Sequence, residues 1–357
     1  MPRHNSEPAS ATDESPSQDE LRREAEAHLK WVLEESGALT DRPTLDQMTP
    51  KQVVELAGGV DAATYLVKRP NGDVVVKLNN IGLEAEATAL QAWKPYTPRV
   101  PKVLGLGTVP SAGEKPIKYL ILSALKNEKG EVVETADSYL KHSPTSAREL
   151  GHAVGAELHR MHRAVVATGF GNFADTPGSE RTYSTWSAYL EDFFGLHADF
   201  VQQLGIADPQ IGAARAFIRS CPFVPEGCFL HGDVTIRNVG VYSYHPMTVG
   251  LFDPNPLIGD PSWDIAPMTN NVAFNELRYR HDTEPPAALT RDRGLLNGFW
   301  ESYSGDVAEE SLLTAQLVQA ILQAEHREEQ LAHSETDTVD VEVTHEFIRA
   351  LVQKVTT

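Results

Sequence analysis

The sequence predicts an α+β protein of two lobes, a small β-rich lobe over residues 19–125 and a larger helical lobe over residues 126–357. Short apolar runs separated by turn residues are concentrated before residue 125, which is typical of strands. From about residue 145, apolar residues recur at helical spacing. Between the two patterns, the polar stretch KNEKGE at residues 126–131 indicates the crossing between lobes. A chain of 357 residues can bury a core in each lobe.

The N-terminus predicts a tail and an additional helix. Residues 1–18 are polar and rich in Ser and Pro, so they cannot bury enough apolar surface to order themselves and are predicted to be flexible. From Asp19, apolar residues lie on one helical face as far as Leu33. Gly37 is a suitable end for this helix.

The strands of the small lobe are predicted from apolar runs and turn signals. Residues 53–56 form the first run, and Gly58 and Gly59 follow as a flexible turn. Asn71-Gly72 is a strong hairpin signal between two further runs. The remaining elements are strands at residues 64–67, 74–78 and 119–125 and a helix at residues 82–93.

The larger lobe opens with a predicted helix at residues 145–166 and closes with two more, at residues 308–331 and 342–354. Residues 270–300 show no clear periodicity and are interpreted as irregular. The first helix carries three histidines, but no carboxylate or cysteine completes a metal-binding set. We therefore interpret them as surface histidines or as histidines with protein partners.

The runs HGDVTIRN (residues 231–238) and FDPNPLIGDPSWDIA (residues 252–266) carry most of the chemistry. Asp233 follows a short apolar strand and can accept a proton from a hydroxyl nucleophile. A hairpin formed by residues 239–242 and 248–252 would place Asn238 and Asp253 at the same edge. Magnesium prefers such a sparse set of hard oxygen ligands, completed by water and phosphate.

Lys77 lies in the apolar run VVVKL, where a lysine is unexpected. One interpretation is an edge strand whose lysine faces solvent. The other is a lysine that holds phosphate oxygens in a cleft, which would need a carboxylate partner. Glu86 in the following helix is well placed for that role, and Glu84 is the alternative.

The composite motif HGDxxxxN, an aspartate after an apolar strand, and GDPxxD resembles the aminoglycoside phosphotransferase family, relatives of protein kinases. The resemblance covers the chain from about Val53 to Arg327. The phrase FDPNPLIGDPSWDIAP is most similar to the subgroup of streptomycin 6-phosphotransferases and hydroxyurea kinases, and the passage from NVG to FDP is also similar to fructosamine kinases. The resemblance implies a bilobal protein-kinase-like fold with a nucleotide-binding N-lobe and an acceptor pocket in the C-lobe.

The resemblance also implies a catalytic set. Asp233 would be the catalytic base, and Asn238 and Asp253 would hold Mg²⁺. Lys77 would contact the α and β phosphates of ATP, with Glu86 as its anchor.

Other residues receive supporting roles from the resemblance. Gly58 and Gly59 would cover the nucleotide, and the main chain of the hinge would hydrogen-bond its base. The hinge residues are Ser123, Ala124 and Leu125, and the residues that support the catalytic loop are His231, Asp260 and Asp264.

Two departures from the family pattern limit this transfer. The loop AGGVDAAT lacks GxGxxG, so GTP is not excluded as the donor. Arg237 stands where many relatives have glycine, and it could neutralise a phosphate or form a surface ion pair.

The charge and composition bear on partners and location. A net charge of −19 disfavours nucleic acid and anionic membranes as partners. Residues 301–357 carry 12 acidic against 3 basic side chains, which suits either a solvated acidic face or a cationic acceptor. The two cysteines fit neither a redox pair nor a zinc site and are interpreted as reduced thiols. No signal peptide or membrane-length apolar run is found, which predicts a cytoplasmic protein.

The sequence thus predicts an ATP-dependent kinase that phosphorylates a hydroxyl of a small molecule, either an antibiotic or an aminated sugar-like acceptor. The alternative is a metabolic or biosynthetic kinase for a sugar, a fructosamine-type adduct or a nucleoside. A nucleotide-binding pseudokinase would be expected to lack a catalytic group, yet Asp233, Asn238, Asp253 and Lys77 are all present. Hydrolase and Rossmann interpretations lack GxSxG and GxGxxG.

Overall fold

The structure is a computed structural model, and it describes residues 18–39, 45, 48–49, 51–56, 63–79, 82–110, 116–166, 169–172, 183–222, 224–331 and 338–357. Except for its last residue, the predicted tail at residues 1–18 lies outside these ranges. The chain forms two compact units, Met1–Asn80 with Leu104–Ile121, and Ile81–Val103 with Leu122–Thr357. The lobe boundary after residue 125 stays a prediction. The helices and strands described below confirm the α+β class.

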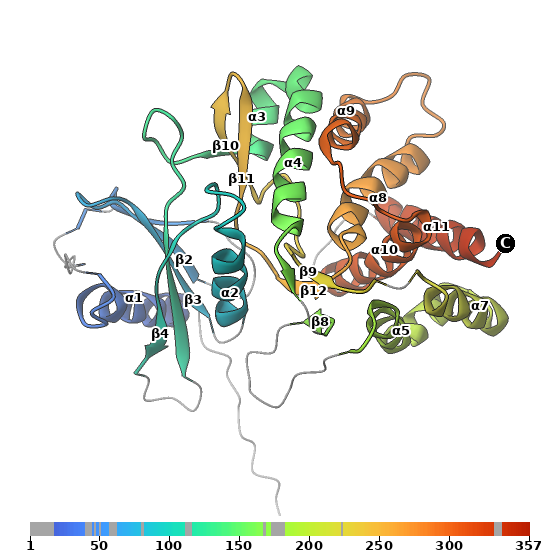
Figure 1. Cartoon of the computed structure of the whole chain (residues 1–357), viewed down its shortest axis with the longest axis horizontal. Coiled ribbons are helices and arrows are strands. Elements are labelled where there is room, and N and C mark those ends of the chain that lie inside the picture. Colours follow the sequence, from blue (N-terminus) through green and yellow to red (C-terminus); the bar gives the residue numbers. More distant parts are fainter. Residues whose placement is uncertain are drawn as a thin grey trace, which may run out of the picture. The chain divides into compact units, whose positions relative to one another are not determined.

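The first unit is a five-stranded sheet with one helix, α1 (Figure 1). The strands lie in the order β1-β2-β3-β5-β4. Leu29, Val32 and Leu33 of α1 are buried in the same core as the sheet residues Val76 and Ile121. The elements are α1 (Gln18–Glu34), β1 (Val53–Glu55), β2 (Ala63–Val67), β3 (Val74–Asn79), β4 (Val103–Val109) and β5 (Ile117–Ser123), the last of which continues into the second unit.

The hairpin between β2 and β3 forms as Asn71-Gly72 predicts. Gly72 has φ of 109°, a conformation that favours glycine, and the strands that follow and precede it pair antiparallel. Lys77 pairs with Thr64 in this ladder, and β3 lies in the middle of the sheet. Lys77 is only 7% exposed. The interpretation of Lys77 as a solvent-facing residue of an edge strand is therefore wrong.

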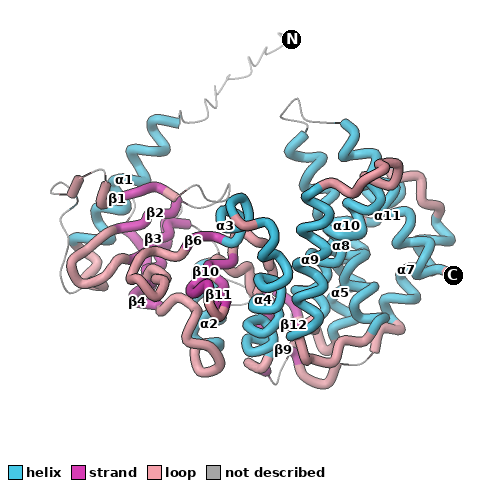
Figure 2. Tube along the Cα trace, turned by 90° about the horizontal axis from the view of Figure 1, so that it is seen from above, coloured by secondary structure: helices cyan, strands magenta, loops and turns pink. Residues whose placement is uncertain are grey.

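The second unit combines two small sheets with most of the helices (Figures 1 and 2). The sheets have the orders β11-β10-β6 and β7-β9-β12-β8. The strands are β6 (Glu134–Thr135), β7 (Val165–Val166), β8 (Gly171–Asn172), β9 (Gly227–Leu230), β10 (Val239–Tyr244), β11 (Met247–Leu251) and β12 (Leu257–Gly259). The α-helices are α2 (Leu83–Trp93), α3 (Ala136–His142), α4 (Ala147–His162), α5 (Trp186–Leu196), α6 (Ala198–Gln203), α7 (Asp208–Arg219), α8 (Ser262–Arg278), α9 (Ala287–Ser302), α10 (Glu309–Leu331) and α11 (Thr338–Thr356).

The helices α4 and α9 approach each other through glycines. A Cβ atom at Gly151 would overlap the carbonyl group of Leu295, and one at Gly298 would overlap the carbonyl of Arg148. A Cβ atom at Gly155 would lie 2.5 Å from the carbonyl oxygen of Phe299, which is also too close. Because no side chain intervenes at these three positions, the two helix backbones are in direct contact and fix each other's position.

The interpretation of residues 270–300 as irregular is wrong. The helix α8 extends to Arg278, and α9 begins at Ala287. The side chains of Asn271 and Asn275 in α8 each donate a hydrogen bond of 2.9 Å to Asp292 in α9, which is 3% exposed. The non-helical residues 279–286 separate the two helices, so residues 270–300 as a whole do not keep one helical period.

The C-terminal helices share one core with α5, α7 and α8. Trp186 and Trp263 meet edge to face within it, with ring centroids 5.7 Å apart. The predicted helices at residues 308–331 and 342–354 correspond to α10 and α11. In the part of the chain that the structure describes, no helix has the length and apolar character needed to cross a membrane.

Candidate active site

Asp233 lies in the loop that leaves β9. Its Oδ2 atom accepts a hydrogen bond of 2.8 Å from the side-chain amide of Asn238, and its backbone carbonyl accepts a second from the same amide at 3.0 Å. The loop closes further through a bond of 2.9 Å from the Asn238 N–H to Thr235. The carboxylate is thus oriented by a residue of its own loop while remaining exposed to a reactant.

Asn238 and Asp253 lie at the same end of the β10–β11 hairpin. Val239 pairs with Leu251, and the N–H of Phe252 donates to the carbonyl of Asn238 at 3.1 Å. The amide nitrogen of Asn238 is used by Asp233, so its amide oxygen is the atom that it can offer to a cation. The carboxylate of Asp253 is exposed. These residues therefore fit the sparse oxygen set that magnesium prefers.

Asp253 has φ of 57°, the sole positive value at a non-glycine residue among those that the structure describes. An aspartate in this left-handed region is uncommon and costs free energy. The surrounding hairpin and loop must hold it there. Such local strain is often found at functional positions.

The backbone at Gly232 makes the approach of two loops possible. Its φ is 76°, and a Cβ atom there would overlap the carbonyl of Asn255. The N–H of Asn255 in turn donates to the carbonyl of His231 at 2.9 Å. A glycine between His231 and Asp233 is therefore required by both conformation and space.

His231 is a buried structural member of the loop. Its Nε2 lies 3.0 Å from the carbonyl of Phe252, so Nε2 carries the hydrogen. Burial lowers its pKa, against the opposing effect of Asp264 and other nearby carboxylates, which favours the neutral ring. The indole of Trp93 stacks on it with centroids 6.1 Å apart, and Trp93 Nε1 donates to Phe229 at 3.3 Å. The helix α2 is thereby attached to the catalytic loop.

Asp264, at the start of α8, accepts hydrogen bonds from two consecutive backbone groups of that loop. The N–H of His231 and the N–H of Gly232 each lie 2.7 Å from it, on different oxygens. A third donor, Nε2 of His162, lies at 2.9 Å. Asp260 has a separate local role, since its Oδ1 accepts from the N–H of Ser262 at 2.8 Å and so begins α8.

The hinge residues extend from β5 into a short β-bridge. The N–H of Ser123 donates a hydrogen bond to the carbonyl of Lys102 at 2.9 Å, and the N–H of Lys102 donates one to the hydroxyl of Ser123 at 2.8 Å. The carbonyl of Leu125 accepts from Val133 at 3.0 Å, and Ala124 lies between them half-buried. These bonds fix the segment to which the sequence assigned recognition of the nucleotide base.

The nucleotide-binding roles of the hinge and of the other predicted residues all stay predictions. Lys77 and Glu86 are both buried, but they belong to different compact units. Gly58 and Gly59 lie outside the described residues. Arg237 is exposed, and both of its interpretations stay open.

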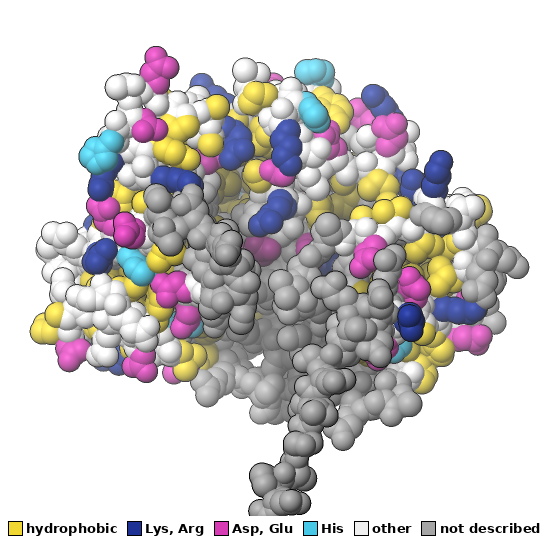
Figure 3. Space-filling view, turned by 180° about the vertical axis from the view of Figure 1, so that it is seen from behind, with side chains coloured by type: hydrophobic (Ala, Val, Ile, Leu, Met, Phe, Trp, Pro, Cys, Tyr) yellow, Lys and Arg dark blue, Asp and Glu magenta, His cyan; other side chains and the backbone are white. Residues whose placement is uncertain are grey.

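Some of the acidic side chains of the C-terminal region contact basic side chains. Glu346 binds Arg280, Glu325 binds His197, and Glu328 binds His345. On the face shown in Figure 3, acidic and basic side chains are interspersed. These contacts fit a solvated acidic surface at the three positions, and the cationic acceptor stays a prediction.

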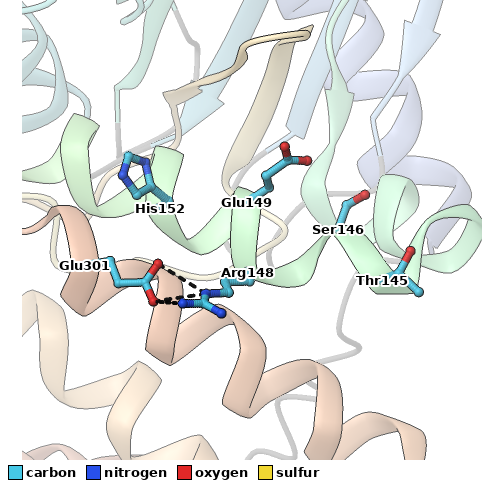
Figure 4. A pocket seen from close by; sticks show the side chains of 6 residues that line it. All are labelled: Thr145, Ser146, Arg148, Glu149, His152 and Glu301. Carbon is cyan, nitrogen blue, oxygen red and sulfur yellow. Dashed lines mark hydrogen bonds and ion pairs between the residues drawn. The ribbon is translucent and has the colours of Figure 1, made fainter.

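A pocket of about 300 Å³ opens at the start of α4 (Figure 4). Arg148 and Glu301 lie in it as an ion pair, with Arg148 Nε 2.9 Å from a carboxylate oxygen. None of the predicted site residues lines this pocket, whose walls are Thr145, Ser146, Arg148, Glu149, His152 and Glu301.

The histidines of α4 differ in their surroundings, and His152 is exposed. Within the described ranges, no group of three or more His, Cys, Asp or Glu side chains is arranged to hold a metal ion. His162 is instead buried with protein partners. Cys221 and Cys228 are free thiols in the interior, and burial raises the pKa of both.

Sequence reasoning missed the residues that support the site from distant segments. Trp93 was only the last residue of the helix predicted at residues 82–93, and Tyr303 was not singled out. Trp93 contacts His231 within the loop of residues 231–238, and Tyr303 contacts His162, a partner of Asp264. No local motif marks such partners, because they are separated from that loop by many residues.

Comparisons with known proteins agree with this geometry. A model of the phosphotransferase enzyme family (APH) matches residues 52–305. No curated protein matches the chain significantly.

Among solved structures, the aminoglycoside phosphotransferase APH(4)-Ia has 16% identity and a TM-score of 0.54, covering 84% of this chain and 93% of its own. A candidate aminoglycoside phosphotransferase from Ralstonia eutropha JMP134 has 9% identity and the same TM-score, covering 85% and 92%. A thermostable mutant of APH(4)-Ia in a ternary complex with AMP-PNP and hygromycin B has 17% identity and a TM-score of 0.50, covering 84% and 93%.

The similar structures confirm the bilobal kinase-like fold, and the family match confirms that the chain is a phosphotransferase with a hydroxyl group as acceptor. The match extends over more than half of the chain. The chain therefore belongs to the phosphotransferase enzyme family.

Proposed function

We propose that this enzyme transfers the γ-phosphate of ATP to a hydroxyl of a small molecule, and that the acceptor is an antibiotic or an aminated sugar-like compound. The observation that carries the proposal is the contact between Asn238 and Asp233, at the hairpin end that also bears Asp253. It unites a proton acceptor and oxygen ligands in one short segment.

Asp233 is the catalytic base in this proposal. Its Oδ2 is engaged by Asn238, which leaves the second carboxylate oxygen for the acceptor hydroxyl. As the oxygen of the hydroxyl attacks the γ-phosphorus, its proton passes to that carboxylate, the bond from the γ-phosphorus to the bridging oxygen breaks, and ADP leaves. The loop bonds at Asn238 and Thr235 prevent the side chain from turning away.

Asn238 and Asp253 are the proposed magnesium ligands, through the amide oxygen and the carboxylate. Magnesium bound there would supply neutralisation of charge on the phosphate oxygens. The strained backbone of Asp253 supports this role, because it directs a carboxylate at a position where relaxed backbone would not.

Nucleotide binding is assigned to the remaining predicted residues. We propose that Lys77 holds phosphate oxygens with Glu86 as its anchor, that Gly58 and Gly59 cover the phosphates, and that Ser123, Ala124 and Leu125 contact the base. The burial of Lys77 in a central strand supports a specific role. The complex of APH(4)-Ia with AMP-PNP supports ATP as the donor, while GTP stays open.

An antibiotic acceptor is supported by the fold shared with APH(4)-Ia, which was solved with hygromycin B. The FDPNPLIGDPSWDIAP phrase favours the streptomycin 6-phosphotransferase and hydroxyurea kinase subgroup. The alternative acceptor is a sugar, fructosamine-type adduct or nucleoside, favoured by the passage from Asn238-Val239-Gly240 to Phe252-Asp253-Pro254. We also propose that the enzyme is cytoplasmic and that it binds neither nucleic acid nor a membrane.

The experiment is a phosphorylation assay with MgATP and a panel of aminoglycosides, other antibiotics, nucleosides and glycated amines. The variants are Asp233→Asn and, as a matched control, Asp199→Asn on the exposed start of α6. We expect phosphorylated product with wild type and Asp199→Asn and a loss of at least about a hundredfold in kcat with Asp233→Asn. Product from a glycated amine or a nucleoside alone would favour the alternative acceptor. Nucleotide binding without any product would contradict the proposal.

A further inference from the structure

Three buried groups form a chain of hydrogen bonds behind the catalytic loop. The hydroxyl of Tyr303 lies 2.8 Å from Nδ1 of His162, and Nε2 of His162 lies 2.9 Å from Oδ2 of Asp264. His162 and Tyr303 are 7% and 6% exposed, and Asp264 is 1% exposed. In such surroundings a hydrogen bond is strong, and a missing partner is costly.

The chain has a definite direction. A carboxylate can only accept, so Nε2 of His162 carries the hydrogen and donates it to Asp264. In a neutral ring with the hydrogen on Nε2, Nδ1 is an acceptor, and the hydroxyl of Tyr303 donates a hydrogen bond to it. Burial raises the pKa of Tyr303 far above its ordinary value, so the phenol retains that hydrogen. Tyr303 thus binds the Nδ1 side of His162, which keeps Nε2 turned toward Asp264.

Asp264 carries the effect to the catalytic loop. Its Oδ2 is shared between His162 and the N–H of His231, while Oδ1 accepts from the N–H of Gly232. Gly232 immediately precedes Asp233 and has no freedom to move toward Asn255. The orientation of one carboxylate therefore fixes two successive peptide groups next to Asp233.

The outer end of the chain is rigid. Tyr303 follows α9 directly, and its ring stacks on Phe299 with centroids 5.1 Å apart and an angle of 15°. It also meets the ring of His159 edge to face at 5.6 Å. His162 ends α4, and α4 is locked to α9 by their backbone contact at Gly151 and Gly298. Both residues are consequently held at the ends of two closely packed helices, α4 and α9.

We propose that His162 and Tyr303 are positioning residues that hold the catalytic loop in its productive conformation through Asp264. The inference rests on the proposed function only in taking Asp233 as the base. Neither side chain touches a reactant in this account. Their contribution is to keep the carboxylate of Asp264 turned toward the N–H groups of His231 and Gly232. These bonds fix the position of the backbone that leads into Asp233.

The test uses Tyr303→Phe, which removes one oxygen and keeps the stacked ring, together with His162→Gln and His162→Leu. Glutamine can still donate to Asp264, whereas leucine cannot. Tyr279→Phe, at the end of α8, is the matched control for loss of a tyrosine hydroxyl. Hydrogen–deuterium exchange of the whole protein reports on the amides of His231 and Gly232 without any need for an acceptor.

We expect exchange of these two amides to become about tenfold faster in Tyr303→Phe and His162→Leu, with partial rescue in His162→Gln. Exchange in the first unit and in the Tyr279→Phe control should match wild type. In the phosphorylation assay, kcat should fall about tenfold with KM for ATP unchanged, because the loop and not the nucleotide site is altered.

Unchanged exchange of the loop amides in Tyr303→Phe would overturn the inference, as would a uniform increase across the whole unit, which indicates only lost stability. Either result leaves the proposed function intact. Conversely, faster local exchange in a protein that phosphorylates nothing would support the positioning contact while refuting the kinase proposal.

Discussion

The helices α4 and α9 make polar contacts in two very different settings. At the end of α4, His162 and Tyr303 form a buried contact that includes Asp264. At the start of α4, Arg148 and Glu301 form an exposed contact within a surface pocket (Figure 4). Arg148 and Glu301 carry opposite charges, but water and salt screen the attraction between them. Water can also take the place of either partner at little cost in free energy. Burial, rather than charge, decides which contact the fold depends on.

Removal of the Asp264 carboxylate is expected to cause the largest loss of stability and so tests the contrast between the buried and the exposed contact most strongly. In Asp264→Ala, two loop N–H groups and the ring of His162 lose their acceptor in the interior. We expect the free energy of unfolding to fall by about 3 kcal/mol or more, since unpaired buried donors pay their full desolvation cost. Urea unfolding followed by tryptophan fluorescence measures it. A loss no larger than that of Glu301→Ala would show that burial does not separate the two contacts.

The next effect concerns the helix contact that carries both polar sites. In Gly298→Ala the added methyl group overlaps the carbonyl of Arg148, so the helices must separate. We expect a loss of about 1–3 kcal/mol in unfolding free energy. Gly212→Ala in α7 is the matched control, because no atom lies within 4 Å of the new methyl group there. Alanine is also the better helix former, so the control should be stabilised by up to about 1 kcal/mol. Equal effects at both glycines would contradict the close packing of α4 on α9.

The smallest effect is expected at the exposed contact. The hydrogen bond from Arg148 lowers the pKa of Glu301. The carboxyl pKa is thus lower in the folded than in the unfolded protein. The pair therefore stabilises the fold at pH values above the pKa of the unfolded state, and this stabilisation is lost as the pH falls through the pKa of the folded state. Because both side chains are exposed, Glu301→Gln should leave the melting temperature at neutral pH unchanged within error. A melting temperature clearly lower than that of wild type, and insensitive to salt, would show that the exposed pair is more than a surface contact.

The same contrast explains what the sequence could and could not predict. His231, Asp233, Asn238, Asp253 and Asp264 lie within a few dozen residues, so hairpin signals and apolar runs suffice to bring them together. Tyr303 and His162 lie far from them along the chain, and each has an ordinary helical context. Their contact depends on the packing of α4 on α9, which no local pattern encodes.

The helices that sequence reasoning missed illustrate the other source of error. Periodicity identifies helices that bury apolar residues, as α1, α10 and α11 do. Residues 270–300 also contain buried apolar residues, among them Val272, Leu289 and Leu295, but they belong to two helices that the non-helical residues 279–286 separate. The change of direction between α8 and α9 interrupts the helical spacing, so the segment taken as a whole shows no single period.

Transfer of labelled γ-phosphate from ATP to an acceptor, measured for wild type, Asp233→Asn and Asp199→Asn under identical conditions, tests the central claim most directly. The geometry of the catalytic loop predicts that Asp199→Asn matches wild type and that Asp233→Asn loses at least about a hundredfold in kcat while still binding ATP. Equal turnover by Asp233→Asn and wild type would contradict the assignment of Asp233 as the base, and with it the proposed mechanism.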